Sequence, residues 1–147
     1  MSFPVPILLV AYNRYDTADK VFNVISKIRP DKFFFAVDGP KDSDEDRVKV
    51  GKVRDMINRI DWNCQLETFF PDNNLGLKVN VSSAINWFFE KVEAGIILED
   101  DCLPNISFFH FCEELLEKYR NDSRVMHIGG NFFQNKRVGS GDYYFSQ

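Results

Sequence analysis

The sequence predicts a Rossmann-like α/β fold with a mostly parallel sheet and helices on both of its faces. Three observations indicate this: short apolar runs alternate with amphipathic helical patterns, turn-forming residues separate them, and 44% of the 147 residues are hydrophobic. Such alternation is typical of parallel sheets, because neighbouring parallel strands need a long crossover connection that is usually a helix. No linker interrupts the chain, so residues 1–147 are predicted to form one domain.

The first part of the chain is predicted to contain two strands, residues 6–11 and 32–37, each a nearly continuous apolar run. Runs of this kind are expected where both faces of a strand are buried. Between them, apolar residues at helical spacing predict a helix that Asp16 caps and Pro30 ends. The apolar stripe of this helix comprises Ala18, Val21, Phe22, Ile25 and Ile28.

In the middle of the chain, the charged segment 41–47 is predicted to be an exposed loop that leads into a second helix. The apolar side of that helix comprises Val53, Met56, Ile57 and Ile60. A third strand is predicted at residues 66–70, and the residues from 71 to 76 have the composition of a turn. A third helix then follows, and its inward side comprises Val81, Ala84, Ile85 and Phe88.

The last part of the chain begins with a very short predicted strand at residues 96–98. Pro104 and Asn105 then open another predicted helix. The apolar stripe of this helix comprises Phe108, Cys112, Leu115 and Tyr119. Two further strands are predicted at residues 124–128 and 142–147.

The composition of the chain argues against several classes of protein. A net charge of −4 disfavours general nucleic-acid binding, which depends on neutralising many phosphates. No apolar run reaches the ~18 residues of a membrane span, and the N-terminus lacks the pattern of a signal peptide. Cys64, Cys102 and Cys112 are odd in number and lack Cys-x-x-Cys spacing, which argues against a disulfide framework or a structural zinc site. We therefore expect a cytoplasmic protein without a transmembrane segment.

Three acidic residues, Glu99, Asp100 and Asp101, directly follow the short strand at 96–98. Clustered carboxylates repel one another unless a cation or hydrogen-bond donors are present. Mn²⁺ or Mg²⁺ is a natural partner, and such an ion needs only one or two protein carboxylates when a diphosphate supplies other oxygens. The alternative is a solvated turn in which Asp101 or Asn105 caps the next helix. The position after a parallel strand favours the metal–diphosphate site, with Glu99 and Asp101 pointing one way and Asp100 the other.

Further polar residues follow the first two strands: Tyr12, Asn13 and Arg14 after the first, and Asp38 after the second. The planar donors of Arg14 suit a phosphate or a base carbonyl, and the carboxylate of Asp38 suits a base imide or a ribose hydroxyl. An Arg14–Asp38 structural ion pair is the alternative interpretation. Because the carboxyl ends of parallel strands meet at one edge of a sheet, we expect these residues to join the acidic triplet in one site.

Lys78 is a weaker candidate, at the start of the helix that follows the turn at 71–76. A helix N-terminus with a nearby lysine suits an anion. The glycine spacing matches neither a Walker A nor a dinucleotide-binding motif, and a plain turn with a helix cap explains the segment equally well.

Several of these segments resemble GT-A glycosyltransferases, in particular N-acetylglucosaminyltransferase I-like proteins and related bacterial sugar transferases. The resemblance extends through nearly the whole chain and involves residues 6–16, 37–40, 74–76, 84–89 and 98–101, with Pro104, Phe108 and Phe109. Its most specific part is the acidic triplet followed by a proline and paired aromatic residues.

The resemblance implies that residues 1–147 are the nucleotide-sugar-binding part of a metal-dependent transferase that uses a UDP-sugar and inverts the sugar configuration. By match to the family motifs, Asp101 binds Mn²⁺ or Mg²⁺, Asp100 contacts ribose and Glu99 contacts a donor-sugar hydroxyl. Arg14 and Asp38 lie around the uracil and the phosphates. The remaining candidate donor-binding residues are Tyr12, Asn13 and Lys78.

In this family the catalytic base and most contacts to the acceptor, a glycan or another hydroxyl compound, lie downstream of the donor-binding part. The base is therefore expected beyond Gln147, and this truncated fold is expected to bind donor with little or no transfer. Two alternatives remain open. A nucleotidyltransferase is disfavoured because the loop at 11–15 has no glycine, and a non-catalytic nucleotide-sugar-binding module is disfavoured by the intact acidic triplet.

Overall fold

Strands and helices alternate through the part of the chain that the structure, a computed structural model, describes: residues 2–130, 141 and 143. The strands are β1 (Ile7–Ala11), β2 (Lys32–Val37), β3 (Gln65–Phe69) and β4 (Ile96–Glu99). The helices are α1 (Tyr15–Ile28), α2 (Asp44–Arg54), the short 3₁₀ helix η1 (Asp55–Arg59), α3 (Leu77–Phe89) and α4 (Ile106–Lys118). The predicted α/β class is confirmed, and within the described residues no helix is both long and apolar enough to cross a membrane.

The four strands form one parallel sheet in the order β3-β2-β1-β4. Leu8 of β1 pairs with Phe34 of β2 on one side and with Ile97 of β4 on the other. The chain therefore builds the sheet outward from β1 to β3, and α3 then returns it to the far side of β1. The direction of winding reverses between β1 and β4, and at such a point the loops diverge and leave a crevice at the carboxyl ends of the strands.

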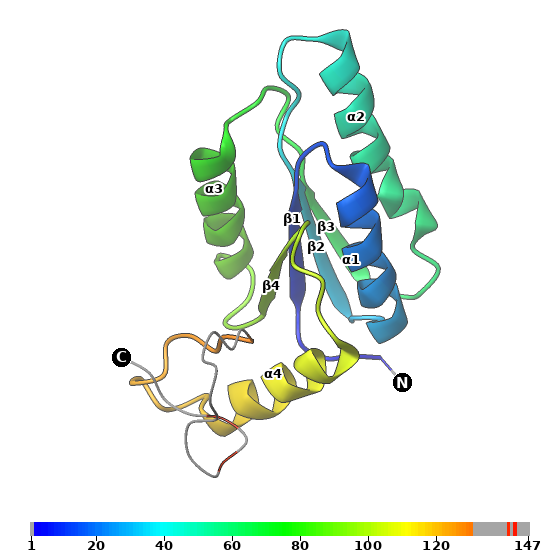
Figure 1. The fold of residues 1–147 in the computed structure, drawn as a ribbon. Coiled ribbons are helices and arrows are strands. Elements are labelled where there is room, and N and C mark those ends of the chain that lie inside the picture. Colours follow the sequence, from blue (N-terminus) through cyan, green and yellow to red (C-terminus); the bar gives the residue numbers. More distant parts are fainter. Residues whose placement is uncertain (1, 131–140, 142, 144–147) are drawn as a thin grey trace.

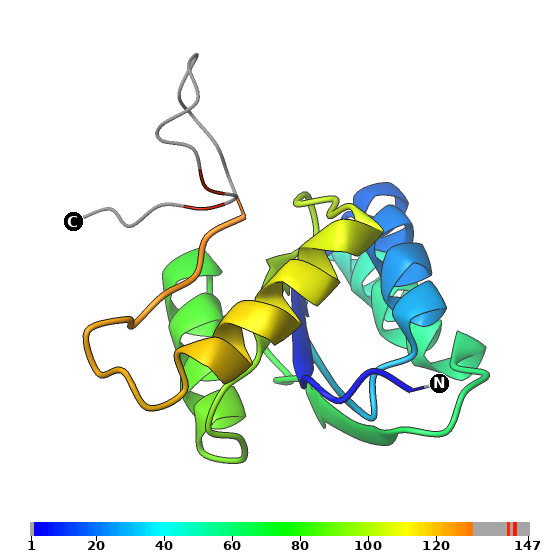
Figure 2. The ribbon, with the colours of Figure 1, turned by 90° about the horizontal axis from the view of Figure 1, so that it is seen from below.

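Side chains of the strands alternate between two apolar layers, one on each face of the sheet. In β2, Phe33 and Phe35 enter the layer shared with α1, α2 and α4, whereas Phe34 enters the layer shared with α3. Figure 1 shows α1 and α2 on one side of the sheet and α3 on the other, and Figure 2 shows the N-terminal end of α4 beside α1. The predicted helices on both faces are confirmed, and burial on both faces explains why β1, and β2 after the exposed Lys32, are apolar.

The start of α1 differs from the prediction. The helix begins at Tyr15 with Arg14 as its N-cap residue, and no side chain makes a capping hydrogen bond, so the prediction that Asp16 caps this helix is wrong. Asp16 instead lies in the first turn, where its charge interacts favourably with the positive end of the helix dipole.

The strand predicted at residues 124–128 does not form, and this prediction is also wrong. The chain turns here, with the N–H of Val125 donating to the carbonyl of Asp122, and Met126 is 92% exposed. A pattern of five residues is too short to predict a strand without a neighbouring strand for it to pair with. The strand predicted at 142–147 lies outside the described residues, apart from Tyr143.

Asn105 caps α4, because its side-chain oxygen accepts a hydrogen bond from the backbone N–H of Ser107. We expect Asn105→Ala to lower the free energy of unfolding by about 1 kcal/mol, since the first turn loses its acceptor. Urea unfolding followed by circular dichroism measures this change. The exposed Asn121 provides a matched control, and Asn121→Ala should change stability by less than about 0.5 kcal/mol. Equal losses in the two variants would contradict the capping role.

Candidate functional site

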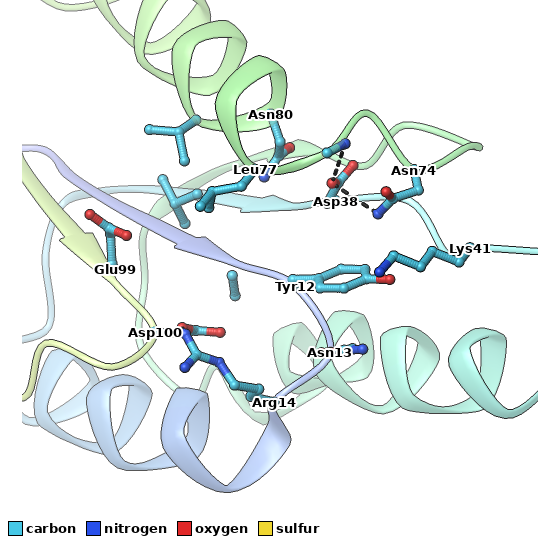
Figure 3. A pocket seen from close by; sticks show the side chains of 14 residues that line it. Tyr12, Asn13, Arg14, Asp38, Lys41, Asn74, Leu77, Asn80, Glu99 and Asp100 are labelled. Atoms are coloured by element: carbon cyan, nitrogen blue, oxygen red, sulfur yellow. Dashed lines mark hydrogen bonds and ion pairs between the residues drawn. The ribbon is translucent and has the colours of Figure 1, made fainter.

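A pocket of about 380 Å³ opens at the carboxyl ends of β1, β2 and β4, where the winding of the sheet reverses. Figure 3 shows polar side chains from the loops after these strands and from the start of α3 around this opening. The residues that line it are Val10, Ala11, Tyr12, Asn13, Arg14, Asp38, Lys41, Asn74, Gly76, Leu77, Asn80, Val81, Glu99 and Asp100. Both the position and the volume are typical of a small-molecule site.

Asp38 follows β2 and is only 3% exposed. Its Oδ1 accepts hydrogen bonds from the backbone N–H groups of Gly39 and Leu75, each at 2.8 Å. Its Oδ2 accepts hydrogen bonds from the N–H of Gly76 and the side-chain amide of Asn74, each at 3.1 Å. A carboxylate offers about four acceptor positions, and these four donors use them. Asp38 therefore ties the end of β2 to the loop before α3 and shapes one wall of the pocket.

Arg54, at the end of α2, also holds the loop after β2 against the loop after β3. Its Nη2 donates to the carbonyls of Asp38 (3.3 Å) and Pro71 (2.6 Å), which holds the ends of β2 and β3 together. Gly39 lies so close to the backbone of Asn73 that a Cβ atom at this position would be 2.2 Å from the carbonyl carbon. The loop between β3 and α3 is therefore packed tightly against the loop after β2.

Arg14 links the acidic residues that follow β4. Its Nη2 donates to Oδ1 of Asp100 at 2.5 Å and to Oδ2 of Asp101 at 3.0 Å. The two segments meet because β4 is the direct neighbour of β1, and Arg14 lies at the junction between β1 and α1. Figure 3 shows the side chains of Arg14 and Asp100 pointing toward one another. Arg14 thus pairs with these aspartates instead of forming the ion pair with Asp38 that the sequence left open.

The two aspartates have different electrostatic environments. Burial raises the pKa of Asp100, although the guanidinium of Arg14 opposes this effect. The hydrogen bond from Arg14 lowers the pKa of the more exposed Asp101, and both aspartates raise the pKa of Arg14. Asp101 is therefore an anion at neutral pH and lies directly beside a cation.

The predicted alternation of the acidic side chains does not extend to Asp101, because one nitrogen of Arg14 contacts both Asp100 and Asp101. Glu99 and Asp100 both line the pocket, whereas Asp101 is half-exposed and is not among the lining residues. The alternation fails because β4 ends at Glu99 and the chain turns at the next two residues. Asp101 is connected to the pocket through Arg14. Lys78 is exposed on α3 and does not line the pocket.

Asp46, in the first turn of α2, organises the loops after β1 and β2. Its buried carboxylate accepts hydrogen bonds from the hydroxyl of Tyr12 (2.5 Å), the side-chain amide of Asn13 (2.6 Å) and the N–H of Lys41 (2.7 Å). Burial raises the pKa of Asp46, but these donors outweigh burial and hold the pKa below its usual value. Burial and the bond to Asp46 raise the pKa of Tyr12 to about 12. Tyr12 and Asn13 thus line the pocket in fixed positions.

We expect Tyr12→Phe to lower the free energy of unfolding by about 2 kcal/mol, the usual contribution of a hydrogen bond to a charged group. The ring keeps its packing, and Asn13 and Lys41 still donate to Asp46, so the fold should be retained. Urea unfolding measures the loss. A variant as stable as the wild-type protein would contradict the role of this bond.

Lys41 and Asn80 are among the pocket residues that were not predicted from the sequence. Lys41 falls in the charged segment that predicts an exposed loop. Asn80 lies on the same stripe of α3 as Ala84 and Phe88, and an amide within an apolar stripe is the signal that identifies it. Asn80 is 3% exposed, and its Oδ1 has no hydrogen-bond partner among the described residues. Since a buried acceptor without a partner is costly, Asn80 is well suited to bind a donor group of a ligand.

The N-terminus of α3 also contributes to the pocket. The helix follows Gly76, whose positive φ of 79° favours glycine and which has no side chain to cap the helix. Asp38 accepts a hydrogen bond from the N–H of Gly76 itself. The first N–H groups of an α-helix have no partners within the helix and bind anions well. Because Gly76 and Leu77 line the pocket, the positive end of α3 is available to an anionic ligand there.

The carboxylates of this site suit a divalent cation only together with oxygens of a ligand. Among the residues that the structure describes, no three His, Cys, Asp or Glu side chains are placed to hold a metal ion. Mg²⁺ and similar ions are often bound by one or two carboxylates, with phosphate oxygens and water completing the shell. Asp101, exposed and ionised, with Asp100 beside it, fits that arrangement.

Comparison with known proteins does not assign a function to this pocket. No protein-family model matches the sequence, and no curated protein matches it significantly. The observations that bear on function are the residues of the pocket, their contacts and the sequence motifs that contain them.

Proposed function

We propose that this protein binds a nucleotide-sugar donor together with Mn²⁺ or Mg²⁺ and acts as a metal-dependent glycosyltransferase. The observation that carries the proposal is the convergence of Arg14, Asp100 and the N-terminus of α3 on one pocket at the switch point of a parallel sheet. Sheets of this class bind nucleotides at that point. The resemblance of the sequence to GT-A glycosyltransferases supports a sugar nucleotide, and UDP-sugars in particular.

In this proposal the diphosphate lies between Arg14 and the start of α3. A guanidinium fork and unpaired N–H groups at a helix N-terminus both suit phosphate oxygens, and both border the pocket. Asp101, with Asp100 beside it, holds the cation. When bound, the cation neutralises the charge of the departing diphosphate.

The nucleoside and the sugar are proposed to contact the acceptor oxygens of Asp100, Glu99 and Asn80. All three residues line the pocket, and ribose hydroxyls, sugar hydroxyls and the base imide are donors that match them. Asp100 is assigned to ribose and Glu99 to a sugar hydroxyl. Tyr12 and Asn13, fixed by Asp46, form the wall beside the base.

The proposed reaction transfers the sugar to a hydroxyl group of a glycan or another acceptor with inversion of configuration. The acceptor oxygen forms a bond to the anomeric carbon, the bond to the diphosphate breaks, and the hydroxyl proton passes to a base. We assign that base to no residue that the structure describes. The binding of donor is therefore the part of the proposal that this chain tests directly.

Calorimetric titration with UDP, GDP, CMP and UTP in the presence of Mn²⁺ tests the proposal. We expect UDP to bind at least about tenfold more tightly than GDP or CMP, a difference of about 1.4 kcal/mol. A nucleotidyltransferase would instead bind UTP more tightly than UDP. Equal affinity for all four nucleotides, or no binding, would contradict the assignment to UDP-sugars.

Asn80→Leu separates ligand binding from stability. Because Oδ1 of Asn80 has no partner within residues 2–130, 141 and 143, replacing this amide by an apolar group of similar size should leave the free energy of unfolding unchanged or raise it slightly. We expect the affinity for UDP with Mn²⁺ to fall by about tenfold, since the ligand loses a buried acceptor. Asn86→Leu, at an exposed position of the same helix, is the matched control and should bind normally. Normal UDP affinity in Asn80→Leu would exclude a ligand contact.

A further inference from the structure

The carboxylate proposed to hold the cation is already engaged within the protein. Oδ2 of Asp101 accepts a hydrogen bond from Nη2 of Arg14 at 3.0 Å, and its Oδ1 lies 3.6 Å from the thiol of Cys102. The same Nη2 also contacts Asp100 at 2.5 Å. A divalent cation at Asp101 would stand beside a guanidinium of like charge, and the two would compete for one carboxylate.

We infer that Arg14 closes the cation site in the free protein, so that the cation and the diphosphate bind as a pair. This inference rests on the proposed function. An entering diphosphate offers the guanidinium new anionic oxygens, so Arg14 leaves Asp101 without losing its ionic contacts. The released carboxylate then accepts the cation, which the same phosphate oxygens also bind. The site thus selects a cation–nucleoside diphosphate complex over either component alone.

The structure of Arg14 suits this exchange. Its backbone is fixed at the N-cap of α1, where its carbonyl accepts a hydrogen bond from Ala18, while its side chain is 55% exposed. The guanidinium therefore turns without moving the helix. Asp100 is much more buried than Asp101, so separating it from Arg14 is the costlier step. Arg14 is accordingly expected to keep Asp100 and to release Asp101.

A second observation points independently to a ligand in this pocket. Asn80 lines the opposite wall, on α3, and its buried Oδ1 has no partner in the part of the chain that the structure describes. One wall of the pocket therefore holds Arg14 paired with its aspartates, and the other holds an unsatisfied acceptor. A ligand that supplies both anionic oxygens and a hydrogen-bond donor would engage the two walls together.

Coupled binding has a thermodynamic consequence. If UDP raises the affinity for Mn²⁺ by some factor, Mn²⁺ must raise the affinity for UDP by the same factor. Arg14 adds to the coupling that the shared phosphate oxygens provide, because it masks Asp101 until the diphosphate arrives. Removing the guanidinium should therefore unmask the carboxylate for Mn²⁺ alone and reduce the coupling.

The experiment measures Mn²⁺ binding from the electron paramagnetic resonance signal of free Mn²⁺, with and without UDP, corrected for the Mn²⁺–UDP complex formed without protein. In the wild-type protein we expect UDP to tighten Mn²⁺ binding by about tenfold or more. Arg14→Gln should bind Mn²⁺ alone about tenfold more tightly than wild type and gain less affinity from UDP than wild type does, because only the shared phosphate oxygens then couple the two ligands. Arg47→Gln removes a similarly exposed arginine, paired with Asp42, and should behave as wild type.

The outcomes separate this inference from the proposed function. If Arg14→Gln binds Mn²⁺ alone no more tightly than wild type, or if UDP does not change the Mn²⁺ affinity of the wild-type protein, the inference is overturned. The proposed function survives either result provided that wild-type protein still binds UDP in the presence of Mn²⁺. If wild-type protein binds neither UDP nor its Mn²⁺ complex, both are overturned. The wild-type measurement is independent of how any variant folds.

Discussion

Asp38→Ala is expected to lower the free energy of unfolding by about 4 kcal/mol, among the largest losses that a single substitution in this protein produces. The carboxylate satisfies the N–H groups of Gly39, Leu75 and Gly76 and the amide of Asn74. Each buried donor left without a partner costs about 1–3 kcal/mol. For a chain of this length, the melting temperature should fall by on the order of 10 °C.

The control for this prediction is Asp61→Ala. Asp61 is an exposed carboxylate that contacts Arg29 at 3.4 Å, and its loss should cost less than about 1 kcal/mol. Asp38→Asn provides a second test, because an amide keeps one acceptor oxygen and places a donor against the remaining N–H groups, so it should also destabilise strongly. Losses in the Asp38 variants no greater than in Asp61→Ala would show that this carboxylate does not hold the two loops together.

The second large effect is expected in ligand binding. Asp101→Asn should weaken UDP binding in Mn²⁺ by on the order of 10–100-fold, since it removes the charge that the cation requires but keeps the size of the side chain. With the metal removed by a chelator, both proteins should bind UDP weakly, and the variant should bind it at least as well as wild-type protein, because the Asp101 carboxylate no longer competes for Arg14. Calorimetric titrations with Mn²⁺ and with chelator measure the four affinities.

Asp61→Asn is the matched control for Asp101→Asn, because it removes another exposed carboxylate that pairs with an arginine. It should leave UDP binding unchanged under both conditions. A loss in Asp101→Asn that is the same with and without Mn²⁺ would place Asp101 outside the cation site. Asp101 is half-exposed, so unfolding of the variant should not account for weaker binding.

The two central strands of the sheet were predictable because both of their faces are buried. β1 is apolar along its whole length and β2 is apolar after Lys32, and the sequence predicts their positions to within one residue. The strand predicted at 124–128 shows the limit of this reasoning. Its apolar residues have no neighbouring strand in the described structure, and local pattern alone does not reveal whether a partner exists.

The assembly of the site was predictable for the same topological reason. Residues that follow β1, β2 and β4 meet because parallel strands share one carboxyl edge, and Arg14, Asp38 and Asp100 do line one pocket. Their partners were not predictable. The bonds of Asp38 depend on a loop 36 residues or more further along the chain, and the contact of Asp46 with Tyr12 spans more than 30 residues.

The directions of the three acidic side chains could not be predicted from the sequence. An extended backbone predicts alternation, but the turn after β4 places Glu99 and Asp100 in the pocket and leaves Asp101 exposed. Asn80 was missed because helical periodicity treats an inward position as packing. A polar side chain in such a stripe deserves consideration as a binding residue, because it is costly unless something satisfies it.

The most direct test of the central claim is a titration of ¹⁵N-labelled protein with UDP and Mg²⁺, followed through the backbone and side-chain amide resonances. We predict the largest changes at the N–H groups of Gly76 and Leu77, at the side-chain amide of Asn80 and in the segment from Tyr12 to Arg14, which border the pocket. Shifts concentrated elsewhere, or no shifts at saturating UDP, would contradict the account of this pocket as a nucleotide-sugar site.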